Sequence, residues 1–197
     1  YCVLAEAGYF PTEWLPTYQH ADSKLPGHPV RQKTPGVELN TGALGHGLPV
    51  AVGLAIAAKR SGSKRKIYVL TGDGELTEGS NWEAAFVAAH YGLDNLIIIN
   101  DKNKLQLAGY TKDIMNTDPL AEKWKAFGMQ VTECEGNDVE AVVSTLESLK
   151  QEGKPNVIIS NTTKGAGVSF IAGRPEWHHR VPKGDEVTQA LEELSNV

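Results

Sequence analysis

The sequence has 197 residues, 41% of them hydrophobic and 22% charged, which predicts one folded domain with a substantial core. Its 19 Lys and Arg against 24 Asp and Glu give a formal net charge of −5, which argues against nucleic acid or an anionic membrane as a partner. The apolar runs are too short to span a bilayer. Only two cysteines, Cys2 and Cys134, are present. A disulfide framework is therefore excluded, and we expect a cytoplasmic protein in a reducing environment.

The first part of the chain predicts two short helices and a long irregular segment. Residues 1–8 resemble the last turns of a helix that Gly8 ends, so we expect that N-terminal residues of this domain precede Tyr1. A second short helix fits residues 11–18. Residues 20–47 are rich in Gly, Pro, Thr, Asn and His. Irregular connections longer than about 12–15 residues are uncommon unless they are functional, so this segment is a candidate binding loop.

From residue 48 onward, predicted helices and strands alternate. Strands are predicted at residues 66–71, 95–100, 129–134 and 155–160, and helices at residues 48–60, 80–91, 119–127, 137–150 and 185–194. The helix at 48–60 is apolar nearly all round, which predicts burial. Ser80 with Glu83 fits a capping box, and Asn137 fits a helix cap. The alternation predicts an α/β fold, in which a parallel sheet carries helices on both faces within a single domain spanning residues 1–197.

Polar, glycine-rich loops follow three of the predicted strands, at residues 72–79, 100–110 and 162–182. Ligands of open α/β sheets bind outside the carboxyl ends of the strands, so we expect these loops to converge on one site. The irregular segment that ends at Gly47 is a fourth candidate, because it enters its helix from the same side.

Two of these loops carry candidate metal ligands. Asp73 stands between Gly72 and Gly74, a pattern that alone also makes an ordinary turn. Asn103 follows the next strand, thirty residues later, which allows both side chains to reach the same end of adjacent strands. A carboxylate, an amide oxygen and a backbone carbonyl, together with diphosphate oxygens, form a site for a hard cation. The pair therefore predicts Mg²⁺ that bridges a diphosphate.

The Gly-Asp-Gly motif followed by this Asn resembles the thiamine diphosphate fingerprint, and further motifs extend the resemblance to transketolases. In chain order the motifs are PGHP at 26–29, TGALGHG at 41–47, GDGELTEG at 72–79, TTKGAG at 162–167 and Trp177-His178. Nearly the whole chain is covered. The chain is similar to the N-terminal, diphosphate-binding part of transketolases, most of all to those split into two polypeptides.

The resemblance implies a role for each matching residue. Asp73, Asn103 and the carbonyl of Leu105 would hold Mg²⁺, for which Ca²⁺ or Mn²⁺ can substitute. His28 and His178 would be catalytic, His28 at the sugar hydroxyls and His178 at both diphosphate and substrate. Glu78 and Glu83 match acidic positions at a subunit interface. The implied thiamine diphosphate contacts are Gly42, Ala43, Leu44, Gly72, Asp73, Gly74, Glu75, Asn103, Lys164 and His178, the first three of which would line the aminopyrimidine.

The implied activity is transfer of a two-carbon ketol unit between sugar phosphates or other anionic sugars. A C-terminal transketolase subunit would supply the pyrimidine-binding domain, including the Glu that protonates the cofactor ring nitrogen. We therefore expect the chain alone to be inactive, and the enzyme to contain two copies of each subunit.

Other interpretations are open for individual residues and for the chain. His46 fits a structural loop histidine bonded to the backbone, and Lys164 fits a solvated surface residue about as well as an anion contact. His179 stands where transketolases usually carry Gly, and an adjacent histidine pair rarely ligates one metal ion. Alternatives for the whole chain are a deoxyxylulose phosphate synthase, a 2-oxoacid dehydrogenase component, or a non-catalytic scaffold subunit. PGHP and Trp177-His178 argue against the first two.

Overall fold

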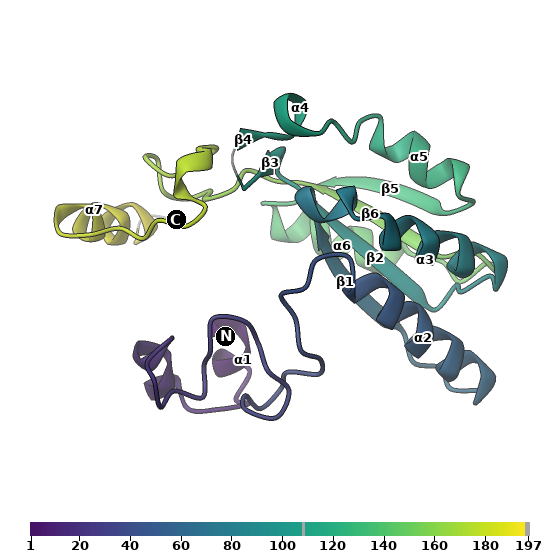
Figure 1. Ribbon diagram of the computed structural model, residues 1–197, viewed down its shortest axis with the longest axis horizontal. Helices are drawn as coiled ribbons and strands as arrows, with labels where there is room; N and C mark the ends of the chain where they lie inside the picture. The colour runs from purple at the N-terminus through teal and green to yellow at the C-terminus, as the bar shows by residue number, and fades with distance from the viewer. Residues whose placement is uncertain (108, 196–197) are drawn as a thin grey trace. The chain divides into compact units, whose positions relative to one another are not determined.

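The computed structural model describes residues 1–107 and 109–195 (Figure 1). The chain divides into two compact units, residues 1–46 and residues 47–197, and each is described by itself. That both belong to a single domain stays a prediction. Among the described residues, no helix is long and apolar enough to cross a membrane.

The first unit contains one short α-helix and one 3₁₀ helix. Helix α1 (Cys2–Glu6) and η1 (Thr12–Thr17) pack around a small core of Ala5, Phe10 and Leu25. The sequence predicted a helix at 11–18 without foreseeing its 3₁₀ form. Pro16 lies inside η1 and has no backbone N–H to continue an α-helical ladder. The rest of the unit consists of turns and irregular backbone.

The second unit is built on a four-stranded parallel sheet, as the sequence predicted. Its strands stand in the order β1 (Ile67–Gly72), β2 (Leu96–Lys102), β6 (Asn156–Asn161) and β5 (Gln130–Glu135). Every neighbouring pair is parallel. Strands β2 and β6 lie in the centre, and most of their residues are buried because helices or neighbouring residues cover both of their faces.

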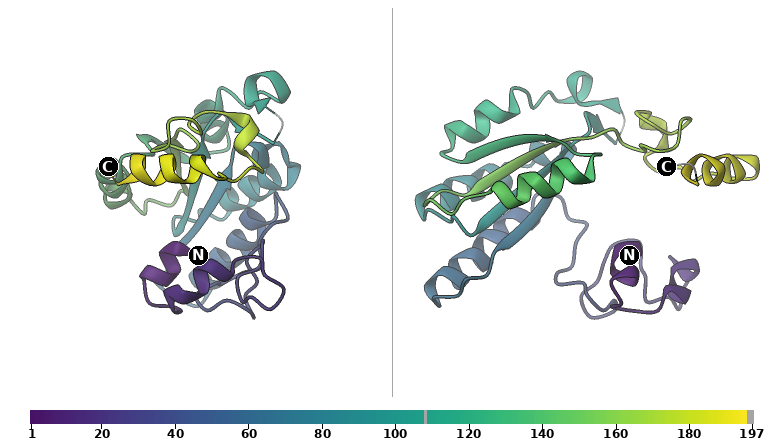
Figure 2. Two further views of the ribbon diagram at one scale, coloured as in Figure 1. Left: turned by 90° about the vertical axis from the view of Figure 1, so that its left-hand side faces the viewer. Right: turned by 180° about the vertical axis from the view of Figure 1, so that it is seen from behind.

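Helices cover both faces of the sheet, which confirms the predicted fold class. Helices α2 (Gly47–Arg60), α3 (Gly79–His90) and α5 (Leu120–Ala126) share one core with the side chains of Ile98 and Ile159. Helix α6 (Val139–Ser148) packs against β5 on the opposite face, in front of the sheet in the right-hand view of Figure 2. The last helix is α7 (Asp185–Leu194).

Three local predictions are wrong in detail. Helix α2 is not buried all round, since Val50 and Leu54 on one side are exposed. Helix α3 begins one residue earlier than predicted, with Glu78 at the cap position, and no side chain caps it. Asp138 rather than Asn137 caps α6, by accepting the backbone N–H groups of residues 140 and 141. The Asn137 side chain instead accepts the backbone N–H of Thr163 at 2.6 Å.

The loops after the strands contain short elements that the sequence did not predict. The first loop forms the 3₁₀ helix η2 (Gly74–Thr77). The second forms an antiparallel pair of two-residue strands, β3 (Leu105–Gln106) and β4 (Gly109–Tyr110), followed by the single turn α4 (Thr111–Ile114). The third contains η3 (Pro175–Trp177). Strands of two residues are too short for a periodic pattern, which explains why they escaped detection.

Candidate functional site

The loops that follow β1, β2 and β6 meet at one edge of the sheet. The three strands are parallel and adjacent, so their carboxyl ends lie side by side. The backbone N–H of Lys104 donates to the Asp73 carboxylate, which joins the first loop to the second. The backbone N–H of Thr162 donates to the Lys102 carbonyl at 3.2 Å, which joins the second loop to the third. The predicted convergence therefore holds for these three loops.

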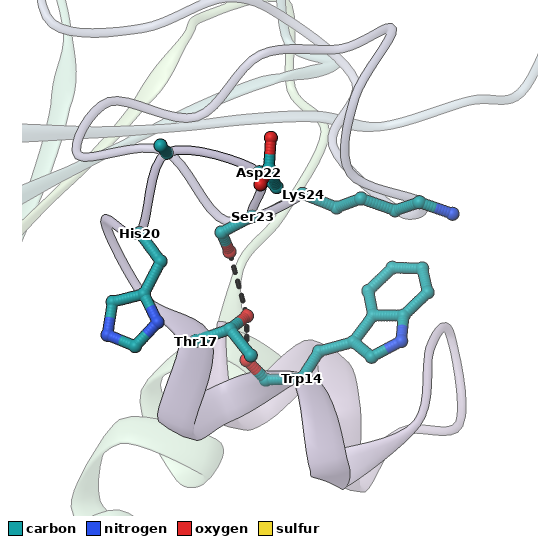
Figure 3. A pocket seen from close by; sticks show the side chains of 7 residues that line it. Trp14, Thr17, His20, Asp22, Ser23 and Lys24 are labelled. Carbon is teal, nitrogen blue, oxygen red and sulfur yellow. Dashed lines mark hydrogen bonds between the residues drawn. The ribbon is translucent and has the colours of Figure 1, made fainter.

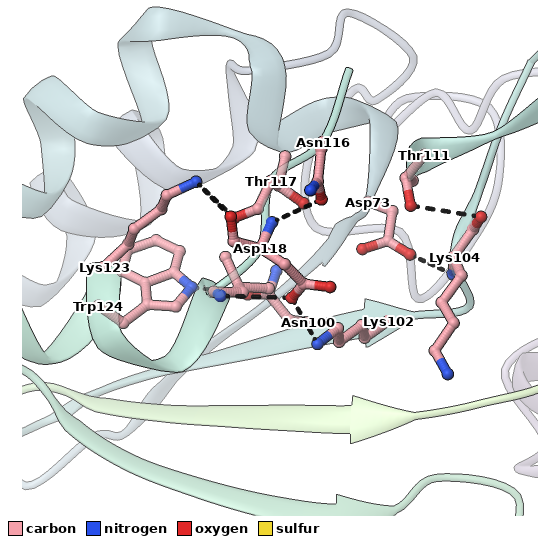
Figure 4. Close-up of polar contacts among 11 residues, drawn as sticks. Asp73, Asn100, Lys102, Lys104, Thr111, Asn116, Thr117, Asp118, Lys123 and Trp124 are labelled. Atoms are coloured by element: carbon pink, nitrogen blue, oxygen red, sulfur yellow. Dashed lines mark hydrogen bonds and ion pairs between the residues drawn. The ribbon is translucent and has the colours of Figure 1, made fainter. Parts of the chain in front are cut away.

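Asp73 is the only carboxylate among the predicted metal ligands, and it is only 3% exposed. It stands at the start of η2, where the turn carries its side chain toward Lys104 (Figure 4). Burial raises the pKa of Asp73 to about 6, the Lys104 bond opposes that shift, and the nearby Asp101 charge adds to it. No Lys or Arg of the described residues forms an ion pair with Asp73. A buried carboxylate with no cationic side chain as partner is suited to a metal ion.

Asn103 and Leu105 lie on the turn that meets Asp73. The Asn103 amide nitrogen donates to the Asp101 carboxylate at 3.1 Å, and its oxygen accepts the backbone N–H of Leu105 at 2.9 Å. The residue between them, Lys104, has a left-handed backbone with φ of 63°. Its N–H is thereby part of the turn that reaches Asp73.

These residues fit a cation that arrives with further oxygen ligands. In the described part of the chain, no three His, Cys, Asp or Glu side chains are grouped so that they could hold a metal ion. Asp73 would therefore act with neutral oxygens, those of the Asn103 amide and the Leu105 carbonyl. Mg²⁺ accepts such a set and usually completes it with water and substrate phosphates. A diphosphate would complete this set.

The turn after β1 is held by bonds from several sides. The Gly72 N–H donates to the Glu75 carboxylate at 3.2 Å. The Asn81 amide donates to the Glu75 carbonyl at 2.6 Å, and the Trp82 indole donates to the Leu76 carbonyl at 2.9 Å. Two side chains of helix α3 therefore hold η2 in place. The predicted contacts of Gly72, Gly74 and Glu75 with a cofactor stay predictions.

Lys164 and His178 lie together after β6. Lys164 Nζ is 2.8 Å from His178 Nδ1, and the ring of His179 packs edge-on against that of His178 with centroids 4.7 Å apart. Burial, then the Lys164 charge and then His179 hold the pKa of His178 below its ordinary value. The buried Trp177 and a bond from Tyr110 Oη to the Gly173 carbonyl at 3.3 Å hold this loop. A neutral histidine beside a lysine forms a candidate anion contact.

His28 and the predicted pyrimidine contacts belong to the first unit. A Cβ atom at Gly42 would lie 2.8 Å from Cγ of His28, and the φ of Gly42 is +117°, so only glycine fits beside this ring. Ala43 and Leu44 are exposed. His46 Nδ1 lies 3.0 Å from the Leu44 carbonyl oxygen, as expected for a structural loop histidine. That this group approaches Asp73 stays a prediction.

Two surface pockets contain none of the predicted site residues. One, of about 400 Å³, lies in the first unit and is lined by Trp14, Thr17 and residues 20–24 (Figure 3). The other, of about 430 Å³, lies between the η2 turn and α5, and its walls include Leu76, Trp82 and Phe127.

The sequence interpretation missed residues that support the candidate ligands. The Asp101 carboxylate accepts both the Asn103 amide and the Thr162 hydroxyl, and so joins the second and third loops. Asn100 and Thr71 form a buried bond between β1 and β2, two residues before Asp73 in the chain. The polar run that begins in the last residues of β2 was visible in the sequence, but the bonding partners depend on strand register and could not be read from it.

Comparison with known proteins identifies the family. Residues 1–195 match the family described as the transketolase, thiamine diphosphate binding domain. The chain belongs to this family. It is 80% identical over 196 residues to an apulose-4-phosphate transketolase subunit of Actinobacillus succinogenes, covering 100% of this chain and 71% of that protein. It is 42% identical over 180 residues to the 6-deoxy-6-sulfo-D-fructose transketolase subunit SqwG of a Clostridium species, covering 91% of this chain and 66% of that protein.

Solved transketolases share this fold. The structure of the Campylobacter jejuni transketolase superimposes with a TM-score of 0.85 at 35% identity, covering 93% of this chain and 30% of that one. The Pichia stipitis transketolase in complex with sedoheptulose-7-phosphate gives a TM-score of 0.86 at 31% identity, with 93% and 29% covered. This chain thus spans 71% of the Actinobacillus relative and less than a third of these solved chains.

Proposed function

We propose that this chain is the diphosphate-binding subunit of a transketolase that transfers a two-carbon ketol unit, with apulose 4-phosphate as the donor. The observation that carries the proposal is the 80% identity to a protein named as a subunit of an apulose-4-phosphate transketolase. The Asp73 turn supports it, because it provides a buried carboxylate and neutral oxygens suited to a magnesium diphosphate.

Asp73, Asn103 and Leu105 would hold Mg²⁺, and the backbone of residues 72–75 would face the diphosphate. When bound, thiamine diphosphate supplies the carbanion-stabilising chemistry that protein side chains lack. The chain's own task is to anchor that cofactor. Asp73 contributes a fixed negative charge, while the turn between Asn103 and Leu105 is already held by the Asp101 carboxylate and by its own backbone.

Lys164 and His178 would bind the negative charge of the diphosphate and of the substrate. With its pKa held low, His178 is neutral at physiological pH, so its Nδ1 accepts from the Lys164 ammonium. The histidine can then donate through its other ring nitrogen to a substrate oxygen. His28 would contact the sugar hydroxyls and move a proton there, and Gly42, Ala43 and Leu44 would line the aminopyrimidine.

A partner subunit with a pyrimidine-binding domain would complete the site, in a complex of two copies of each subunit in the cytoplasm. The names of the relatives support a partner, since both are called transketolase subunits. Exposed apolar side chains on and beside α2 and α3 support an interface there, namely Val50, Leu54, Phe86, Val87 and Tyr91. The predicted interface residues Glu78 and Glu83 are also exposed.

The test is to assay ketol transfer from apulose 4-phosphate by this chain, alone and with its partner subunit, in the presence of thiamine diphosphate and Mg²⁺. We expect transfer only by the complex, and weaker transfer from 6-deoxy-6-sulfo-D-fructose. No transfer by the complex from either sugar would refute the activity. Full turnover by the chain alone would refute the partner requirement.

A further inference from the structure

A chain of buried polar groups lies near the carboxyl ends of β1 and β2, a few residues before the candidate metal ligands. Thr71 of β1 and Asn100 of β2 are register partners, and each is 1% exposed. The Asn100 amide nitrogen donates to the Thr71 hydroxyl oxygen. The Asn100 amide oxygen accepts the indole N–H of Trp124, a wholly buried residue of α5, at 2.8 Å (Figure 4). Because an indole nitrogen only donates, Trp124 determines which way the Asn100 amide is turned.

Packing alone does not account for an asparagine at this position. The four residues before it in β2, at 96–99, are all Leu or Ile, and the surrounding core is apolar. Burying an amide is unfavourable unless its groups are bonded. Replacing a bonded buried set with apolar groups of the same shape is often neutral or stabilising. Apolar residues at positions 71, 100 and 124 together would therefore serve the core as well, so the bonded set is expected to serve something else.

The bonded groups stand where the candidate ligands leave the sheet. Thr71 precedes Asp73 by two residues, and Asn100 precedes Asn103 by three. The segment that leads into α5 is tied to the end of β2 a second time, because the Asp118 carboxylate binds Lys102 Nζ at 2.7 Å. The two side-chain bonds of Asn100 thus join β1, β2 and α5. A few residues further along the chain, the Lys104 N–H donates to the Asp73 carboxylate.

We propose that Asn100 is a positioning residue for the magnesium and diphosphate site. Its buried amide holds the ends of β1 and β2 at the spacing that lets Asp73 and Asn103 reach one cation. This inference rests on the proposed function. Asn100 would contact neither the metal nor the cofactor, so its loss should lower the affinity of the site for both. Residues that orient metal ligands typically alter metal affinity by about 10–100-fold when removed, and we expect that range here with a much smaller effect on kcat at saturation.

The experiment compares Thr71→Val and Asn100→Ala with a matched control, Asn95→Ala. Thr71→Val is nearly isosteric and replaces the hydroxyl with a methyl group. Asn95 is also a buried asparagine, 6% exposed, but it lies just before the first residue of β2 and donates to the Ala55 carbonyl at 3.0 Å. Two quantities are measured on the full chain with its partner subunit. One is the Kd for Mg²⁺ with thiamine diphosphate by titration calorimetry, and the other is amide hydrogen exchange over residues 101–107 without cofactor.

We expect Kd to rise about 10–100-fold in Thr71→Val and in Asn100→Ala. In Asn95→Ala, Kd should stay within about twofold of wild type, even if this variant has a lower Tm. Amide hydrogen exchange over residues 101–107 should accelerate in these two variants only. Thr71→Ser keeps the hydroxyl, so its Kd and its exchange should match those of wild type. Unchanged Kd and exchange in Thr71→Val and Asn100→Ala would overturn the proposal. An equal rise in Kd and in exchange in Asn95→Ala would also overturn it. If wild type binds no cofactor while the exchange pattern holds, the proposed function fails, and the result shows only that Asn100 orders residues 101–107.

Discussion

Replacing Asp73 with Asn is expected to stabilise the cofactor-free chain while removing the proposed metal site. Burial raises the pKa of Asp73 from 3.8 to about 6, which means that the folded state disfavours the ionised carboxylate. Between these two pH values the folded state keeps a proton that the unfolded state has released. The free energy of unfolding therefore falls as pH rises through this window, and the full penalty is present above about pH 6.

The size of the effect follows from the shift. About two pKa units correspond to at most about 3 kcal/mol, and solvent at the sheet edge reduces this to roughly 1–2 kcal/mol. Asn is neutral at every pH, and its side-chain oxygen can still accept the Lys104 N–H. At about pH 7.5, Asp73→Asn should therefore melt roughly 2–8 °C higher than wild type in the absence of cofactor. At about pH 5 the difference should shrink, because wild-type Asp73 is then largely protonated in the folded state.

Thermal unfolding at both pH values, with and without Mg²⁺ and thiamine diphosphate, tests this reasoning. The cofactor should raise the Tm of wild type and leave that of Asp73→Asn unchanged. Asp118→Asn is the control of opposite sign. Lys102 holds the pKa of Asp118 below its ordinary value, so that carboxylate stabilises the fold above its unfolded pKa and the variant should lose a little stability at neutral pH. An Asp73→Asn variant that melts below wild type at neutral pH would refute the account.

Further variants test the other predicted roles. Asn103→Ala should abolish cofactor-dependent activity while circular dichroism stays native, and normal turnover of this variant would show that Asn103 is not a metal ligand. His28→Ala and His178→Ala should each lower kcat/KM by roughly 10²–10⁴-fold in steady-state assays. Calorimetry should show a larger loss of cofactor affinity for His178→Ala, and equal losses would contradict their separate roles. Lys164→Ala should raise the pKa of His178 toward its ordinary value, as followed by NMR titration, and an unmoved pKa would exclude the contact in solution.

The fold was predictable where the sequence carries long periodic signals. The apolar run at 96–99 marks a central strand, and alternation with helices requires parallel connections, so the α/β class followed from the chain itself. Caps were less predictable, because Asn137 and Asp138 are adjacent and either residue type can cap a helix. The β3–β4 pair has too few residues for a pattern.

The candidate site was predictable at the level of loops but not of bonds. Asp73 and Asn103 follow adjacent strands, and that placement alone brings their loops together. Their supporting contacts depend on tertiary structure. Asn100 meets Thr71 only because of the β1–β2 register, and it meets Trp124 only because α5 docks on that face. No local sequence pattern encodes either contact. The one signal that the sequence offers is a polar residue at the end of an apolar strand.

Asp73 and Lys164, the two charged groups discussed at this edge of the sheet, favour binding of Mg²⁺ together with a diphosphate over binding of either one alone. Asp73 is the only carboxylate among the candidate ligands, and one ligating negative charge holds free Mg²⁺ weakly because the ion dehydrates reluctantly. Lys164 supplies one positive charge beside a neutral histidine, which is little for a free diphosphate. If both bind together, the cation would neutralise the charge of Asp73 and part of the negative charge of the diphosphate. Lys164 would neutralise part of the remaining diphosphate charge. The arrangement therefore predicts that Mg²⁺ and the diphosphate bind cooperatively, each raising the affinity for the other.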